Sequence, residues 1–202
     1  MRFLIGMPIF GIINLETLPI PIMKKAFVSL LLAVFAVVAV QTTLYAQKDP
    51  SESLTPRASP MAVAKTMYGD EGYAKVVYCR PQKKGREIFG GIVAYDKVWR
   101  TGANEATEVT FTEDIEINGK TLEAGTYALF TIPGKDEWTV IFNSALGQWG
   151  AYQYDESKDV MRVKADVQES DQMYEAFTIA FAEDGSSMMM VWDKTMVTVP
   201  LG

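Results

Sequence analysis

Histidine is absent from all 202 residues, and cysteine occurs once, as Cys79. Without histidine the chain cannot use a Ser-His or Cys-His pair, and it cannot bind a metal through imidazole. A single cysteine cannot form an intrachain disulfide. Any chemistry must therefore rely on carboxylates, amides, hydroxyls, basic side chains or the single thiol.

An excess of basic residues is also lacking, because 19 Lys and Arg residues stand against 25 Asp and Glu residues. The resulting net charge of −6 repels phosphate backbones, and no stripe of Lys and Arg offsets it. We therefore expect no nucleic-acid partner. Hydrophobic residues make up 49% and charged residues 22% of the chain, which is the composition of a globular domain.

Residues 23–46 have the parts of a secretory signal peptide. Lys24 and Lys25 precede an uncharged run at 26–40 that is shorter than the roughly 20 residues of a membrane-spanning helix, and Ala46 is the small residue before the cleavage point. We expect cleavage after Ala46, a periplasmic or secreted protein, and no membrane span in the mature chain. Residues 1–22 contain prolines and a glutamate ahead of a complete signal, which indicates a misassigned start before Met23.

Residues 47–58 combine prolines with small polar residues and are expected to form a flexible linker. From 59 to 200, short alternating runs rich in β-branched and aromatic residues predict seven or more strands, at 73–79, 107–117, 126–132, 138–142, 160–167, 174–182 and 188–192. Turn sequences separate several of them: Asn118-Gly119, Pro133-Gly134 and Asp184-Gly185. Since no long amphipathic helix intervenes, the pattern predicts an all-β, antiparallel single domain of sandwich or jelly-roll type.

The same alternation predicts a set of core residues: Tyr78, Val109, Phe111, Leu129, Phe130, Ile141 and Phe177. Adjacent Leu129 and Phe130 face opposite sides of a strand, so both are buried only where each face of the sheet is covered. Cys79 lies in an apolar run and is expected to be buried and chemically inert.

Two long stretches, 80–106 and 143–158, interrupt the strands, and a short helix at 86–89 or 94–98 fits within the first. Loops of this length in a compact domain are often functional. The first stretch concentrates three arginines, an amide and a carboxylate: Arg80, Arg86, Arg100, Asn104 and Glu105. Because the arginine fork binds carboxylate or phosphate through two parallel hydrogen bonds, we expect these five side chains to converge, with Trp99 beneath them.

Three roles fit this cluster. Arg100 paired with Glu105 would simply fix the loop on the domain. The same side chains would otherwise bind an external anion. In a hydrolase or lyase, Glu105 would act as the acid or base while Arg100 stabilises negative charge.

The second stretch offers Trp149 and Tyr152 among glycines and amides. Such aromatic rings either stack on a sugar, in a ligand-binding site, or cap the end of the domain. Asp155, Glu156 and Asp159 lack the ligand spacing of a calcium loop, and consecutive methionines at 188–190 point to alternate faces of a strand. We expect no metal and no cofactor.

These stretches carry several motifs together: Tyr78-Cys79-Arg80-Pro81, Lys84-Gly85-Arg86, Ile88-Phe89-Gly90, the run from Val98 through Thr107, Ala124-Gly125-Thr126-Tyr127 and Trp149-Gly150. In this respect the chain, from about 59 to 200, resembles the domain-of-unknown-function 2911 family of secreted bacterial proteins. The resemblance implies an exported single domain and supplies no reaction, cofactor or partner. Cys79 stands where the family usually has serine, which argues against a nucleophile there.

The sequence therefore favours an exported, noncatalytic domain that binds a small anionic or carbohydrate ligand, or an envelope partner, through its two long loops. A carboxylate-dependent enzyme and a purely structural envelope protein are the alternatives. Under the favoured hypothesis the ligand-binding residues are the five of the first stretch together with Trp149 and Tyr152.

Overall fold

The computed structural model describes residues 56–202; the predicted signal peptide at 23–46 and the extension at 1–22 lie outside the described residues. The strands are β1 (Met61–Tyr68), β2 (Gly72–Cys79), β3 (Thr107–Phe111), β4 (Ile115–Ile117), β5 (Lys120–Leu122), β6 (Gly125–Ile132), β7 (Glu137–Asn143), β8 (Asp159–Phe181) and β9 (Ser187–Pro200). One short 3-10 helix, η3 (Glu156–Lys158), precedes β8. Within 56–202, no helix is long and apolar enough to cross a membrane.

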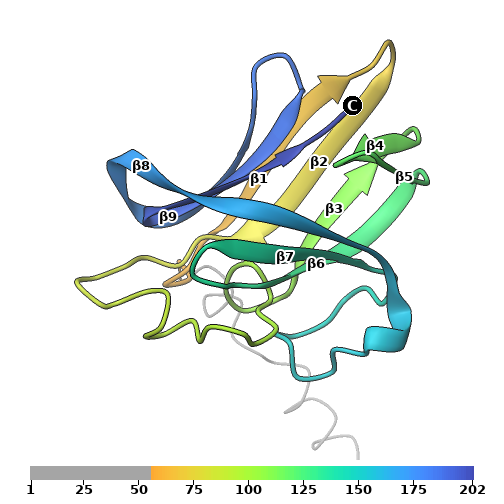
Figure 1. The fold of residues 1–202 in the computed structure, drawn as a ribbon. Coiled ribbons are helices and arrows are strands. Elements are labelled where there is room, and N and C mark those ends of the chain that lie inside the picture. The colour runs from red at the N-terminus through yellow and green to blue at the C-terminus, as the bar shows by residue number, and fades with distance from the viewer. Residues whose placement is uncertain (1–55) are drawn as a thin grey trace, which may run out of the picture. The chain divides into compact units, whose positions relative to one another are not determined.

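Seven strands form one antiparallel sheet in the order β1-β2-β3-β6-β7-β8-β9, and β4 pairs with β5 in a separate hairpin. The 23-residue β8 pairs with β7 along its first part and with β9 along its second. A backbone bridge between Gln82 and Ala176 joins the segment after β2 to β8, so the sheet curls back into two facing layers (Figure 1). The predicted all-β antiparallel fold is confirmed, with both layers supplied by one curled sheet.

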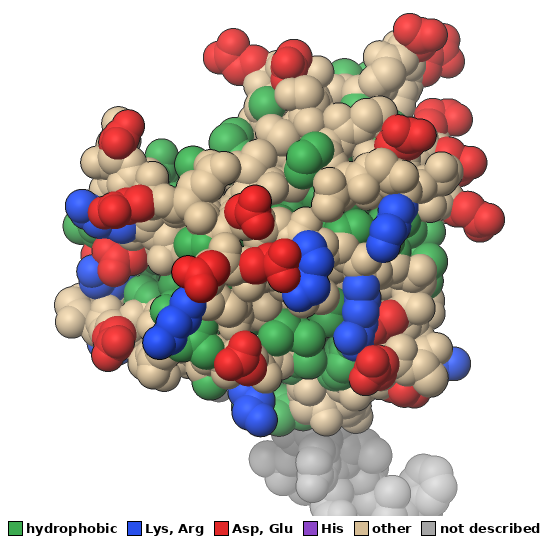
Figure 2. Space-filling view, viewed as in Figure 1, with side chains coloured by type: hydrophobic (Ala, Val, Ile, Leu, Met, Phe, Trp, Pro, Cys, Tyr) green, Lys and Arg blue, Asp and Glu red, His purple; other side chains and the backbone are tan. Residues whose placement is uncertain are grey.

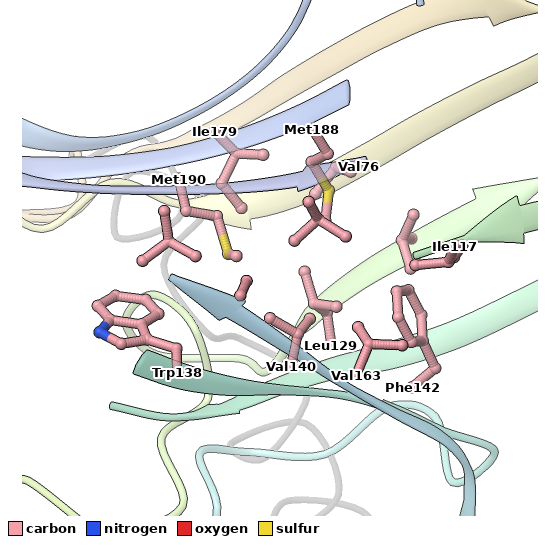
Figure 3. Packing of buried hydrophobic residues seen from close by; sticks show 14 of the residues in the cluster. Val76, Ile117, Leu129, Trp138, Val140, Phe142, Val163, Ile179, Met188 and Met190 are labelled. Carbon is pink, nitrogen blue, oxygen red and sulfur yellow. The ribbon is translucent and has the colours of Figure 1, made fainter. Parts of the chain in front are cut away.

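The main core fills the space between these layers. In Figure 3, Met188 and Met190 of β9 point from one layer towards Val140 of β7 in the other. All seven predicted core residues are buried, with exposed fractions between 0% and 5%: Tyr78, Val109, Phe111, Leu129, Phe130, Ile141 and Phe177. The sequence pattern therefore identified buried positions correctly.

A second, smaller cluster lies on the other face of β6 and β7. Phe130 packs there with Ala128 and Ile141, while Leu129 belongs to the main core. Residues of the two long stretches cover this cluster: Val98, Ala106, Ala151 and Tyr154. Both faces of β6 are thus covered, as the burial of adjacent Leu129 and Phe130 requires.

The predicted turns lie where the sequence placed them. Asn118 and Gly119 both have positive φ, 49° and 73°, which is the geometry of the two-residue turn that joins β4 to β5. Pro133-Gly134 separates β6 from β7, and Asp184-Gly185 separates β8 from β9.

Other boundaries differ from the prediction. The run 107–117 is two strands. The predicted strands 160–167 and 174–182 merge into the single strand β8, which ends at Phe181, and β9 continues to Pro200. Strand β1 was not predicted, and the short helix at 86–89 or 94–98 is absent from the structure. That segment forms turns instead, because Phe89 and Trp99 are drawn into the aromatic core and the backbone closes on itself between Ile88 and Val93.

Candidate functional site

The first loop (80–106) and the second loop (144–158) meet side by side. Gly150 N donates to Asn104 O at 2.9 Å, Ala106 N donates to Gln148 O at 2.9 Å, and Glu105 forms a backbone bridge with Trp149. Two motifs separated by more than forty positions are therefore held against one another.

A strained turn brings the first loop to this position. Thr101 and Asn104 have positive φ, 52° and 59°, which is unfavourable for a β-branched residue such as threonine. The Thr107 hydroxyl donates to Thr101 O at 2.6 Å, and the Thr101 hydroxyl donates to Thr131 at 3.2 Å. Trp99 and Thr131 exchange two backbone hydrogen bonds at 2.7 and 2.9 Å. These contacts fix the turn on β6 and offset its strain.

Arg80 and Arg86 already have protein acceptors. The Arg80 guanidinium donates to Phe177 O at 3.2 Å and to the Thr178 hydroxyl at 2.8 Å, both on β8. The Arg86 guanidinium donates to Lys83 O at 3.0 Å and to Gln82 O at 2.5 Å within its own loop. Both arginines thus hold the first loop in place.

Arg100 differs from both. Its Nε is buried and has no hydrogen-bond partner among residues 56–202, and no ion pair of the described chain includes it. Arg100 lines a groove of about 380 Å³ together with Lys97, Val98, Trp99 and Tyr152. A buried N–H group without an acceptor costs roughly 1–3 kcal/mol, so the unpaired Nε lowers the stability of the folded state.

Gly150 makes room for the Arg100 side chain. A Cβ atom at position 150 would lie 2.9 Å from Arg100 Nη1 and 3.0 Å from the Tyr152 ring, and Gly150 has a φ of 71°. Gly147, on the same loop, has a φ of 68° but open space around its Cα. Gly150 of the Trp149-Gly150 motif therefore leaves the space that the Arg100 side chain occupies.

The two aromatic residues of the second loop face solvent. The exposed fraction of Trp149 is 58% and that of Tyr152 is 83%. Capping of the domain end by these rings, one of the two alternatives, does not occur; Tyr154, which was not singled out, performs this role by packing on Phe130 with ring centroids 5.1 Å apart. Tyr152 lines the Arg100 groove with an exposed ring.

Glu105 does not pair with Arg100. One nitrogen of Arg57 donates to both of its carboxylate oxygens, at 2.7 and 2.8 Å. This contact, with smaller contributions from other groups, lowers the pKa of Glu105. Arg57 lies in the predicted linker, where no local pattern distinguishes it.

Cys79 is buried, as predicted, with an exposed fraction of 1%. Its thiol donates to Glu105 Oε2 at 3.5 Å, and burial raises the pKa of the thiol. The neighbouring Arg80 is engaged on β8 and is not directed at the sulfur. Cys79 is accordingly a protonated, structural residue rather than a nucleophile.

The residues named for catalysis line different cavities. Glu105 lines a small cavity beside Cys79, whereas Arg100 lines the larger groove with Tyr152. The lowered pKa keeps Glu105 ionised at neutral pH, which does not suit a general acid. Nothing in this geometry favours the hydrolase or lyase hypothesis.

A polar network that the sequence did not reveal fixes the second loop to β8. The Asp159 carboxylate accepts hydrogen bonds from the Tyr154 hydroxyl at 2.6 Å, from Arg162 Nε at 2.7 Å and from Asn143 Nδ2 at 2.7 Å. Arg162 also donates to the Tyr154 hydroxyl at 2.7 Å. Asp159 and Arg162 are therefore structural residues.

This network makes stability sensitive to alkali. Burial, followed by the contact with Asp159, raises the pKa of Tyr154 from 10.0 to about 12. The unfolded chain then loses this proton first, so stability is complete below about pH 10 and falls as the pH rises through about 12. Urea unfolding from about pH 9 to pH 12 should show the decline, and Tyr154→Phe should reduce it. An equally steep decline in the Phe variant would contradict this assignment.

Charge is distributed unevenly over the molecule. In the view of Figure 2, the upper end carries acidic side chains alone, whereas basic side chains lie lower, among further acidic ones. The two loops occupy the lower part of the same view (Figure 1). An anion would therefore meet less repulsion at the loops than at the opposite end of the domain.

A family model described as "Protein of unknown function (DUF2911)" matches residues 59–201, most of the chain. The match confirms the resemblance seen in the motifs. The chain matches no curated protein and no solved structure. Its function must therefore be argued from the geometry of the site.

Proposed function

We propose that this chain, which belongs to the DUF2911 family, binds a small organic anion in the groove beside Arg100. One observation carries the proposal: Arg80 and Arg86 have protein acceptors, and Arg100 has none within the described chain. A carboxylate or phosphate group is the planar or tetrahedral acceptor that a guanidinium takes best.

The groove suits a ligand of moderate size. Its volume of about 380 Å³ lies within the range of small-molecule sites. Lys97 adds a second cation, and Val98 and Trp99 supply apolar walls. Tyr152 presents an exposed ring at the rim, which is suited to a sugar face or an apolar body. The ligand class is thus an anionic head group on an apolar or saccharide body.

The proposed setting is the periplasm or the medium. The signal-peptide pattern at 23–46 supports export, and the buried single cysteine is compatible with an oxidising compartment. The protein would bind its ligand after export, without catalysing a reaction.

A thermal-shift series tests the proposal. The purified chain is screened against carboxylates, phosphates, acidic sugars and the matching neutral sugars. An anionic ligand at 100 times its Kd stabilises the folded state by about 2.7 kcal/mol, whereas its neutral counterpart should have no effect. Arg100→Ala should abolish this shift without lowering the unliganded melting temperature, because the change removes a buried N–H group that has no partner.

Matched glycine variants sharpen the test. Gly150→Ala should displace Arg100 and weaken anion binding, whereas Gly147→Ala introduces the same backbone strain without the steric contact. Both variants should lose similar stability, and only Gly150→Ala should lose affinity. Anion stabilisation that survives in Arg100→Ala would refute the proposed site, and a large loss of unliganded stability would favour the structural-protein hypothesis.

A further inference from the structure

A second cavity is lined by the paired segments of the two loops, at Glu105-Ala106 and Gly147-Gln148. Its volume is about 170 Å³, and its polar lining comes from Cys79, Glu105, Glu108 and Gln148. Apolar lining comes from residues that include Met61 and Val77, and no Lys or Arg lines it. The cavity therefore combines a largely apolar wall with two carboxylates, whereas the Arg100 groove carries basic side chains.

One side-chain oxygen of Gln148, which lines this cavity, lacks a hydrogen-bond donor. The residue is only 6% exposed, and its Nε2 donates to Ala145 O at 2.7 Å. Its Oε1 is buried and has no hydrogen-bond partner within residues 56–202. A buried acceptor without a donor destabilises the folded state, so a ligand that supplies an N–H group would be favoured.

The contact between Glu105 and Arg57 indicates which kind of donor group can bind at this carboxylate. A single nitrogen, Nη1 of Arg57, lies between both carboxylate oxygens, at 2.7 and 2.8 Å. A primary ammonium could make the same contact, because it needs only one nitrogen with several protons. The Arg57 side chain is 52% exposed, and an ion pair of such exposure is weak and exchanges readily.

We infer that this cavity binds a small organic cation, a primary ammonium or guanidinium on a short alkyl chain, in exchange for Arg57. The cationic group contacts Glu105, and its further protons are available to Glu108 and to Gln148 Oε1. Met61 and Val77 line the space for the alkyl chain. No group of three or more Asp, Glu or Cys residues suited to a metal occurs in the described chain, which favours an organic cation over a metal ion. The inference does not depend on the anion groove.

Calorimetric titration of the full chain with butylammonium, butylguanidinium and neutral 1-butanol tests it. One or both cations should bind saturably and 1-butanol should not, and the stronger cation identifies the preferred head group. Glu105→Gln should weaken binding by about tenfold or more, the effect of a lost charged hydrogen bond. Arg57→Ala should strengthen binding by about two- to fivefold, because it removes the internal competitor.

Arg100→Ala is the control that separates the two sites, since it should leave cation binding unchanged. Cation binding that is as tight in Glu105→Gln as in the parent, or unchanged in Arg57→Ala, would overturn the inference. So would equal binding of 1-butanol. If Glu105→Gln fails to fold, the Arg57→Ala titration alone decides, because that variant retains the carboxylate.

Discussion

Replacing Trp99 with alanine should lower the free energy of unfolding by about 3–5 kcal/mol, the usual effect of removing a large aromatic side chain from a core. Trp99 stacks on Trp192 with centroids 6.1 Å apart and an interplanar angle of 17°. It also meets Phe89, Trp138 and Phe177 edge to face, at 6.0, 6.1 and 5.1 Å.

Trp149→Ala is the matched control. It removes an identical side chain that is 58% exposed, and exposed substitutions usually change stability by less than about 0.5 kcal/mol. Urea unfolding followed by far-ultraviolet circular dichroism measures both variants without relying on tryptophan fluorescence. Equal losses in the two variants would show that the aromatic cluster does not stabilise the first loop.

Local signals in the sequence were enough for the fold class. Asn118-Gly119 needs no distant contact to form its turn, since both residues adopt positive φ easily. The alternation around Val109 and Phe111 directly reports which face of β3 is buried. Such features depend on neighbours along the chain, which is why they were predictable.

Strand β1 was not predicted because its solvent-facing side carries the larger apolar side chains. Its outward positions carry Met61, Val63 and Met67, which are between 55% and 59% exposed. Its inward positions include the small Ala62 and Ala64, which pack against the core. Alternation between apolar and polar residues is therefore absent, and only pairing with β2 defines the strand.

The hydrogen-bond partners of the site residues are set by contacts between residues far apart in the sequence. Arg80, Arg86 and Arg100 cannot be told apart from the sequence. They differ in whether a protein acceptor lies within hydrogen-bond distance of the guanidinium. Arg80 finds its acceptors on β8, 97 and 98 residues away, and Glu105 is held by Arg57 from 48 residues before it. Neither contact has a local signature, so neither the free state of Arg100 nor the partner of Glu105 could be predicted.

Two adjacent residues of β6 pack in different clusters, so replacing each in turn distinguishes the stability of the domain from the ordering of its loops. Leu129 and Phe130 are both fully buried, with exposed fractions of 0%. Leu129 packs in the main core between the layers, whereas Phe130 supports the small cluster beneath the loops. The Phe130 ring contacts Tyr154, which the Asp159 network holds.

Phe130→Ala should lower the free energy of unfolding by about 3–5 kcal/mol, and Leu129→Ala by about 2–5 kcal/mol. The two losses overlap, but their local consequences should differ. Removing Phe130 leaves Tyr154, Ala151 and Val98 without the surface on which they pack. The second loop should then open below the global transition, because few other apolar contacts hold it. Leu129→Ala leaves that surface intact.

Native-state hydrogen exchange distinguishes the two outcomes. The amides of Gly150 and Ala106 donate across the loop pairing and report whether the loops remain together. In Phe130→Ala these amides should lose protection well before the amides of β7, and anion binding at Arg100 should weaken because Ala151 and Tyr152 line the same groove. In Leu129→Ala protection should fall evenly across the domain. Uniform loss of protection in both variants would mean that the loops unfold only with the whole sheet, and that the small cluster does not position the groove.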